Sequence, residues 1–252
     1  MTNYLYKVLP PQYSHVNKVY CLLVATVFCA LPLCSTEAAA ENILKYDGTT
    51  DIHGDAKTRA SKNEYDGIDI RITGVDPGYY TETTEALVVD GKTLNVKGKG
   101  KFVRIVNTAQ NERIDNNGGI YAKGGSTVNF TDVDSIYIAA IAGKEGGNDS
   151  TVISAKDPIW KDRTGYTNTI NISGTVIQLI GSIDVFHSFG SVLNPNARHT
   201  VNAALSGSDS FWYGSAIGES DERTAVNLSL ADGATWIFNA GRSLLNAGGI
   251  IS

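Results

Sequence analysis

The residues around His187 contain the functional groups of a serine-hydrolase triad. Asp184 precedes this histidine, and Ser188 and Ser191 follow it. In such a triad the serine attacks, the histidine accepts its proton and the carboxylate orients the histidine. Neither G-x-S-x-G nor Gly-Asp-Ser-Gly surrounds these serines, and serine is frequent along the whole chain. Chance proximity is the favoured interpretation, and we expect no catalytic residue here.

Asp132 and Asp134 could form a pair of carboxylates of the kind that polysaccharide-cleaving β-helices need. Residues two apart in a strand point to the same face. Val128 and Phe130 have the same parity, which would turn both aspartates toward the interior unless a bulge intervenes. We therefore expect a turn that presents them as loop oxygens without a catalytic role.

Two glycine-containing segments could hold ions. Residues 97–101, Lys-Gly-Lys-Gly-Lys, could surround an anion, but no helix follows them, which favours a solvated turn. Residues 146–149, Gly-Gly-Asn-Asp, are one incomplete copy of a calcium-binding repeat, and calcium needs six or more oxygen ligands. The sequence predicts neither a metal site nor a cofactor site.

Three aromatic residues are candidates for stacking on a sugar: Trp212, Tyr213 and Trp236. Consecutive strand residues project to opposite faces, so Trp212 lies on the face opposite to Tyr213. Stacking of these rings in the interior is the favoured alternative.

An asparagine set between apolar residues recurs four times, at Asn129, Asn171, Asn202 and Asn227. The successive spacings are 42, 31 and 25 residues, and each copy is followed by a Gly- or Asp-bearing turn and a second apolar segment. Units of this size are typical of solenoids. We interpret the recurring residue as a structural repeat, an amide ladder in which each side chain bonds to the next, rather than as a ligand site.

The segments around these asparagines alternate between apolar and polar residues over four to six positions, which predicts strands with one buried face. No stretch after Ala40 sustains a helical pattern. The sequence predicts an all-β protein, with a loop-rich N-terminal cap at residues 41–65 and a repeat domain at residues 66–252. A β-sandwich is the alternative, because Asp-Gly turns would suit its hairpins. The unequal spacing of the repeat favours a solenoid.

The first forty residues differ from the rest of the chain. A polar segment that carries Lys7 and Lys18 is followed by an apolar run at residues 20–34 and by small residues that end at Ala38 and Ala40. This order predicts a signal peptide cleaved after Ala40. A membrane anchor is the alternative, but the run is shorter than the roughly 20 residues a spanning helix needs.

The cysteine count and the charge limit the function classes. All three cysteines lie in the predicted signal peptide, so the mature chain would contain none, and its stability would come from repeated packing rather than from disulfides. The 252 residues carry a net charge of −5. No basic cluster indicates nucleic-acid binding.

Residues 120–140 and 209–241 resemble the passenger regions of bacterial autotransporters, the type V secretion family, in their Gly-rich turns, T-V-N strands and A-D-G-A-T-W units. The resemblance implies a right-handed parallel β-helix exported through a C-terminal β-barrel translocator in the outer membrane. It implies secretion or display at the cell surface and an adhesin-like, non-enzymatic role toward glycans or proteins of a host or neighbouring cell.

The chain departs from the family pattern because no barrel-like strands precede Ser252, so we expect an N-terminal fragment. A polysaccharide-cleaving enzyme and a structural spacer without a ligand are the alternative functions.

Overall fold

The computed structural model describes residues 42–49, 58–73, 75–76, 85–108, 110–111, 118–140, 151–156, 166–186, 197–218 and 223–238. All of them belong to one compact unit, Ala40–Ser252. Every regular element in these ranges is a strand, which confirms the predicted all-β class. These ranges therefore contain no helix that could cross a membrane.

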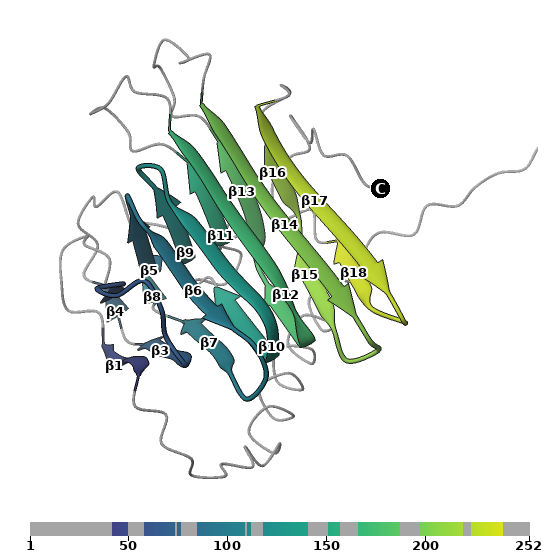
Figure 1. The fold of residues 1–252 in the computed structure, drawn as a ribbon, viewed down its shortest axis with the longest axis horizontal. Coiled ribbons are helices and arrows are strands. Elements are labelled where there is room, and N and C mark those ends of the chain that lie inside the picture. Colours follow the sequence, from purple (N-terminus) through teal and green to yellow (C-terminus); the bar gives the residue numbers. More distant parts are fainter. Residues whose placement is uncertain are drawn as a thin grey trace, which may run out of the picture. The chain divides into compact units, whose positions relative to one another are not determined.

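The described strands form two large sheets and one pair (Figure 1). The first sheet has ten strands: β1 (Ile43–Thr49), β3 (Gly67–Thr73), β6 (Thr93–Lys97), β7 (Phe102–Asn107), β10 (Thr127–Ala140), β12 (Thr167–Ile180), β14 (Arg198–Ser206), β15 (Phe211–Gly214), β17 (Thr224–Ala231) and β18 (Thr235–Phe238). The second has six: β2 (Thr58–Arg59), β5 (Glu85–Asp90), β9 (Gly118–Lys123), β11 (Thr151–Lys156), β13 (Ser182–Phe186) and β16 (Ala216–Gly218). The pair is β4 (Val75–Asp76) with β8 (Gln110–Asn111).

The chain passes repeatedly between the two large sheets. After β10 it enters the second sheet as β11, returns as β12, crosses again as β13 and returns as β14. Each return places a strand beside its counterpart from the previous pass, as β10, β12, β14 and β17 lie in Figure 1. All pairings among the described strands are parallel, which excludes the antiparallel sandwich and is compatible with a β-helix or solenoid.

Apolar residues from both large sheets form one buried cluster. In the first sheet Val128, Phe130, Ile170 and Val201 are completely buried, and their outward neighbours are polar and partly exposed. The second sheet contributes residues such as Ile153 to the same cluster. One strand face alone buries too little apolar surface, so the neighbouring passes stabilise one another by covering each other's inward side chains.

Asp132 and Asp134 lie at a bulge within β10 and not in the turn that the sequence predicted. The register with β12 shifts between Phe130 and Val133, and Asp132 has a positive φ of 57°. Val133 is therefore the next inward residue and is completely buried, while Asp132 and Asp134 are exposed. The extra residue changes the parity of the strand, so the aspartates lie outside rather than inside.

The first strand lies within the segment that the sequence assigned to a loop-rich cap. β1 pairs with β3 from Ile43↔Gly67 to Thr49↔Thr73. Leu44 and Tyr46 are partly buried against the apolar cluster. The sheet therefore extends into residues 41–65, because these few apolar residues pack against the apolar cluster while their backbone pairs with β3.

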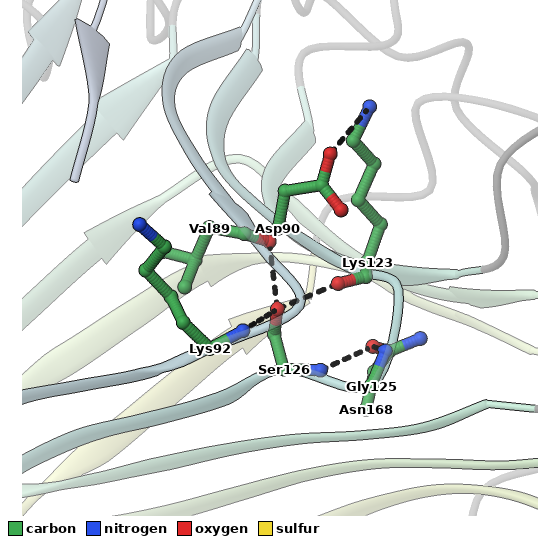
Figure 2. Close-up of polar contacts among 7 residues, drawn as sticks. All are labelled: Val89, Asp90, Lys92, Lys123, Gly125, Ser126 and Asn168. Atoms are coloured by element: carbon green, nitrogen blue, oxygen red, sulfur yellow. Dashed lines mark hydrogen bonds and ion pairs between the residues drawn. The ribbon is translucent and has the colours of Figure 1, made fainter. Parts of the chain in front are cut away.

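A buried serine joins two turns at the start of the β10 strand (Figure 2). Ser126 is completely buried, and its Oγ lies 2.9 Å from the carbonyl oxygen of Val89 and 2.6 Å from that of Lys123. The same oxygen accepts the backbone N–H of Lys92. This one hydroxyl thus links the turn between β5 and β6, at Val89 and Lys92, to the turn between β9 and β10, at Lys123.

The next passes continue this column of buried polar side chains. Asn168 Oδ1 accepts the backbone N–H groups of Gly125 and Ser126 at 3.0 and 2.9 Å, as the dashed line in Figure 2 indicates for one of them. Its Nδ2 must then be the donor toward His199 Nδ1, 3.1 Å away. His199 is completely buried. The column therefore links the beginnings of β10, β12 and β14.

Tyr65 closes the short turn before β3. Its ring is buried, and its phenolic oxygen accepts the backbone N–H groups of Ser61 and Lys62 at 3.1 and 3.0 Å. Burial disfavours the phenolate and raises the pKa of Tyr65, but the hydrogen bonds from Ser61 and Lys62 favour the phenolate. The net result is a pKa below the ordinary value of 10.0.

Candidate functional site

Five asparagine side chains form a continuous chain of amide hydrogen bonds across the first sheet. The Nδ2 of Asn129 donates to Oδ1 of Asn95 at 2.9 Å, and Asn171 donates to Asn129 at 2.8 Å. Asn202 donates to Asn171 at 2.7 Å, and Asn227 donates to Asn202 at 2.8 Å. We call these five residues the asparagine ladder. Its members occupy equivalent positions in β6, β10, β12, β14 and β17.

The ladder lies on the outer face of the sheet. Its residues alternate with buried apolar residues; Asn227 is exposed and the other four are partly exposed. An amide group has two N–H donors and two acceptor lone pairs. The ladder uses one donor and one acceptor of each interior member, so the second donor and the second lone pair remain for another partner.

Small hydroxyl-bearing residues flank the ladder on the side where the strands begin. Thr127 of β10 is in register with Thr93 of β6 and with Thr169 of β12, and Thr169 is in register with Thr200 of β14. In β17 this position is Ala225. These side chains point outward, beside the asparagines, because they are two residues away along each strand.

A groove runs across the strands on the other side of the ladder. It crosses β10, β12, β14 and β17 and has a volume of about 310 Å³. Asn171, Asn202 and Asn227 line it. Three small outward residues also line it, Ser173, Ala204 and Ser229, and these are in register with one another.

The residues that line this groove determine its chemistry. None has an ionisable side chain: the lining consists of Asn, Ser, Thr, Ala, Ile and Leu residues. General acid–base catalysis and nucleophilic activation need a titratable group close to the reacting atoms. The groove combines a mostly apolar surface with neutral amide and hydroxyl groups, which suits the binding of an uncharged molecule that has both apolar faces and hydrogen-bonding groups.

The candidate aromatic residues are divided between the two faces of the sheet. Trp212 is 1% exposed and belongs to the apolar cluster. Trp236 is partly buried, and its ring lies parallel to that of Trp212 with the centroids 4.9 Å apart. Tyr213 is partly exposed and lies on the opposite face of the strand from Trp212. Only Tyr213 of the three points toward the outer face.

The glycine-containing loop at residues 97–101 is occupied by a carboxylate of the chain itself. The backbone N–H of Gly100 donates to Oδ2 of Asp134 at 3.1 Å, and Asp134 N–H donates to the Lys101 carbonyl at 3.0 Å. Gly98 and Gly100 both have positive φ, of 97° and 78°. Asp134 thus makes a structural contact that stabilises the loop.

Several candidate residues lie outside the described part of the chain. They include the predicted cleavage residues Ala38 and Ala40, the possible calcium segment 146–149 and the triad candidates His187, Ser188 and Ser191. Asp184, from the same triad, lies in β13 and accepts the Thr151 hydroxyl at 2.8 Å. In the part of the chain that the structure describes, no three His, Cys, Asp or Glu residues are grouped as metal ligands.

Sequence reasoning missed two parts of this surface. Asn95 begins the ladder, and its sequence Thr-Leu-Asn-Val has the Thr–apolar–Asn–apolar pattern of Thr127–Phe130, a signal that could have identified it. The small residues Ser173, Ala204 and Ser229 become a groove only because their strands are in register. Comparison of the chain with protein-family models, with curated proteins and with solved structures found no match.

Proposed function

We propose that this chain is an exported, adhesin-like passenger region of the autotransporter type that binds a ligand on the outer face of its first sheet and performs no catalysis. We further propose that its parallel strands form a right-handed β-helix. The observation that carries the binding role is the groove beside the asparagine ladder, which combines unused amide donors and acceptors with a lining free of ionisable groups.

Export is supported by residues 1–40, whose order of polar, apolar and small residues is that of a signal peptide. The partner for surface display is an outer-membrane β-barrel translocator, and the ligands are glycans or proteins of a host or neighbouring cell. Expression in a Gram-negative host followed by mass spectrometry of the exported protein tests this part. A mature N-terminus at Glu41 supports export, and an intact Met1 in the cytoplasmic fraction contradicts it.

The binding role is tested by applying the purified full chain to arrays of glycans and matrix proteins. Saturable binding to one ligand class supports the proposal, and no binding on any array favours a structural spacer. The same protein is incubated with acidic and neutral polysaccharides while new reducing ends are measured. Sustained release of reducing ends, abolished by Asp132→Asn, would establish the enzymatic alternative.

A further inference from the structure

We propose that the groove beside the asparagine ladder binds one extended, uncharged polysaccharide chain, which runs along the ladder and therefore across the strands. This inference rests on the proposed binding function and names its ligand. The contact groups would be the outward amides of Asn171, Asn202 and Asn227.

The direction of the ligand follows from the repeat of these amides. Neighbouring strands of a sheet are roughly 4.8 Å apart, so equivalent amides recur at that distance along the ladder. The groove crosses four strands, from Thr131 of β10 to Ser229 of β17, which corresponds to about 14 Å. A sugar ring has a length comparable to the strand spacing, so a chain of sugars presents its hydroxyl groups at intervals that the amides can follow.

The lining of the groove is mostly apolar, and its amides are the groups that select hydroxyl groups. A sugar hydroxyl both donates and accepts a hydrogen bond, and each interior ladder amide retains one donor and one acceptor. The amides are already oriented by their bonds to one another. Little side-chain entropy is therefore lost when a ligand binds, which favours affinity.

The absence of charge in the lining excludes acidic and basic polymers as the preferred ligands. Carboxylate and sulfate groups are bound most strongly by arginine or lysine. Lys97 of β6 is in register with the lining residue Thr131, but Lys97 itself does not line the groove. The lining contains neither the cations for an acidic polymer nor the carboxylates for a basic one. Asp132 borders one end of the groove, where its backbone N–H donates to the Ser173 hydroxyl oxygen, but it is not part of the lining.

An extended peptide is the less suitable occupant. Peptides that bind to sheets gain affinity by pairing their backbone with a free strand edge. The groove lies on the face of the sheet, where the backbone groups of β12 and β14 already pair with each other. A peptide in this groove would leave most of its own backbone groups to be satisfied by a few amides.

One substitution can close the groove without altering the ladder. Ala204 lies in the lining, is exposed and points outward from β14. Ala204→Phe places a large ring in the groove, and phenylalanine is well tolerated in strands. Thr235→Phe is the matched control, because Thr235 is also exposed and in a strand but does not line the groove.

Isothermal titration of the purified full chain with unbranched glucose, mannose and xylose oligomers of increasing length tests the inference. We expect affinity for at least one neutral series to rise with length until the oligomer spans the four strands, and then to level off. Ala204→Phe should weaken this binding by at least roughly tenfold, and Thr235→Phe should leave it unchanged. Asn202→Ala, which removes the central amide, should also weaken it.

The inference is overturned if oligogalacturonate or oligochitosan binds as tightly as the neutral series, or if Ala204→Phe binds like the wild type. If the chain binds array ligands, including peptides, but no neutral oligomer, this inference is overturned while the proposed binding function stands. If the chain binds nothing on any array, the proposed function itself fails. The two failures are therefore distinguishable.

Discussion

The indole rings of Trp212 and Trp236 lie parallel, with an interplanar angle of 5° and 4.9 Å between their centroids. Each indole N–H donates to a glycine carbonyl of the preceding pass, Trp212 to Gly181 at 2.9 Å and Trp236 to Gly214 at 3.0 Å. Gly214 has no room for a side chain, because a Cβ there would lie 2.0 Å from the Gly181 carbonyl oxygen. The tryptophans and the glycines beside them therefore form one packing unit.

This arrangement predicts a structural role for both rings. Trp212→Ala should lower the free energy of unfolding by about 3–5 kcal/mol, the usual cost of removing a large buried aromatic side chain. Trp236→Ala should cost less, because Trp236 is only partly buried. Urea unfolding monitored by circular dichroism measures both. A Trp212→Ala variant of unchanged stability with reduced glycan binding would instead assign this ring to a ligand site.

The ladder should contribute to stability according to the number of bonds that each member makes. Asn202→Ala removes the bonds to Asn171 and Asn227 and should destabilise the fold by roughly 1–2 kcal/mol. Asn227→Ala removes one exposed bond and should cost less than about 1 kcal/mol. Chemical denaturation compares the two. Equal costs would contradict a ladder in which interior members matter more than the final one.

The positive φ of Asp132 indicates that glycine at this position would not lower the stability of the fold. A residue with a side chain is destabilised by roughly 1–2 kcal/mol in the left-handed region, and glycine is not. The side chain of Asp132 is exposed, and the Ser173 hydroxyl bonds to its backbone N–H at 3.2 Å, a contact that substitution preserves. Asp132→Gly should therefore maintain or raise stability, whereas Asp132→Val should lower it by more than about 1 kcal/mol.

Asp232 provides the matched comparison for this position. Its φ is 53°, but its carboxylate also accepts the Ser206 hydroxyl at 2.6 Å. Asp232→Gly relieves the same backbone strain and loses that bond, so its gain should be smaller than that of Asp132→Gly. Thermal unfolding of the two variants in parallel measures the difference. A larger gain at Asp232 would contradict this interpretation.

Tyr65 should make stability depend on pH in the alkaline range. Its pKa is below 10.0 in the folded state, so the folded chain releases this proton at a lower pH than the unfolded chain does. The resulting contribution is fully present above pH 10.0 and is lost as the pH falls through the folded-state pKa. The stability difference between wild type and Tyr65→Phe should therefore grow as the pH rises through this window. A difference that is constant with pH would contradict the assignment.

Much of the fold could be predicted because alternation is a local property. Val128 and Phe130, or Val201 and Ala203, give the inward face of a strand directly, and the structure buries all of them. The bulge at Asp132 could not be predicted, because an aspartate with positive φ has no distinctive neighbours in the sequence. The strand β1 was missed for a related reason: few apolar residues mark it, and its pairing with β3 supplies the order.

The candidate site was predictable only in part. Asn129, Asn171, Asn202 and Asn227 are visible as a repeat, but their bonds join residues 25 to 42 positions apart, and the intervening segments vary in length. The groove depends on the register of the four strands that it crosses, which local sequence does not specify. His199 illustrates the same limit, because it continues a buried polar column that begins with Ser126 and Asn168, two other residue types.

The asparagine ladder also bears on how such a chain can diverge. Each asparagine is positioned by the amide of its neighbour and not by its distance along the polypeptide, since the intervals of 34, 42, 31 and 25 residues all lead to the same alignment. Insertions and deletions between passes therefore leave the sheet intact and alter only what protrudes from it. Natural variants should accumulate length changes in these connections, while the lengths and register of the strands stay nearly constant.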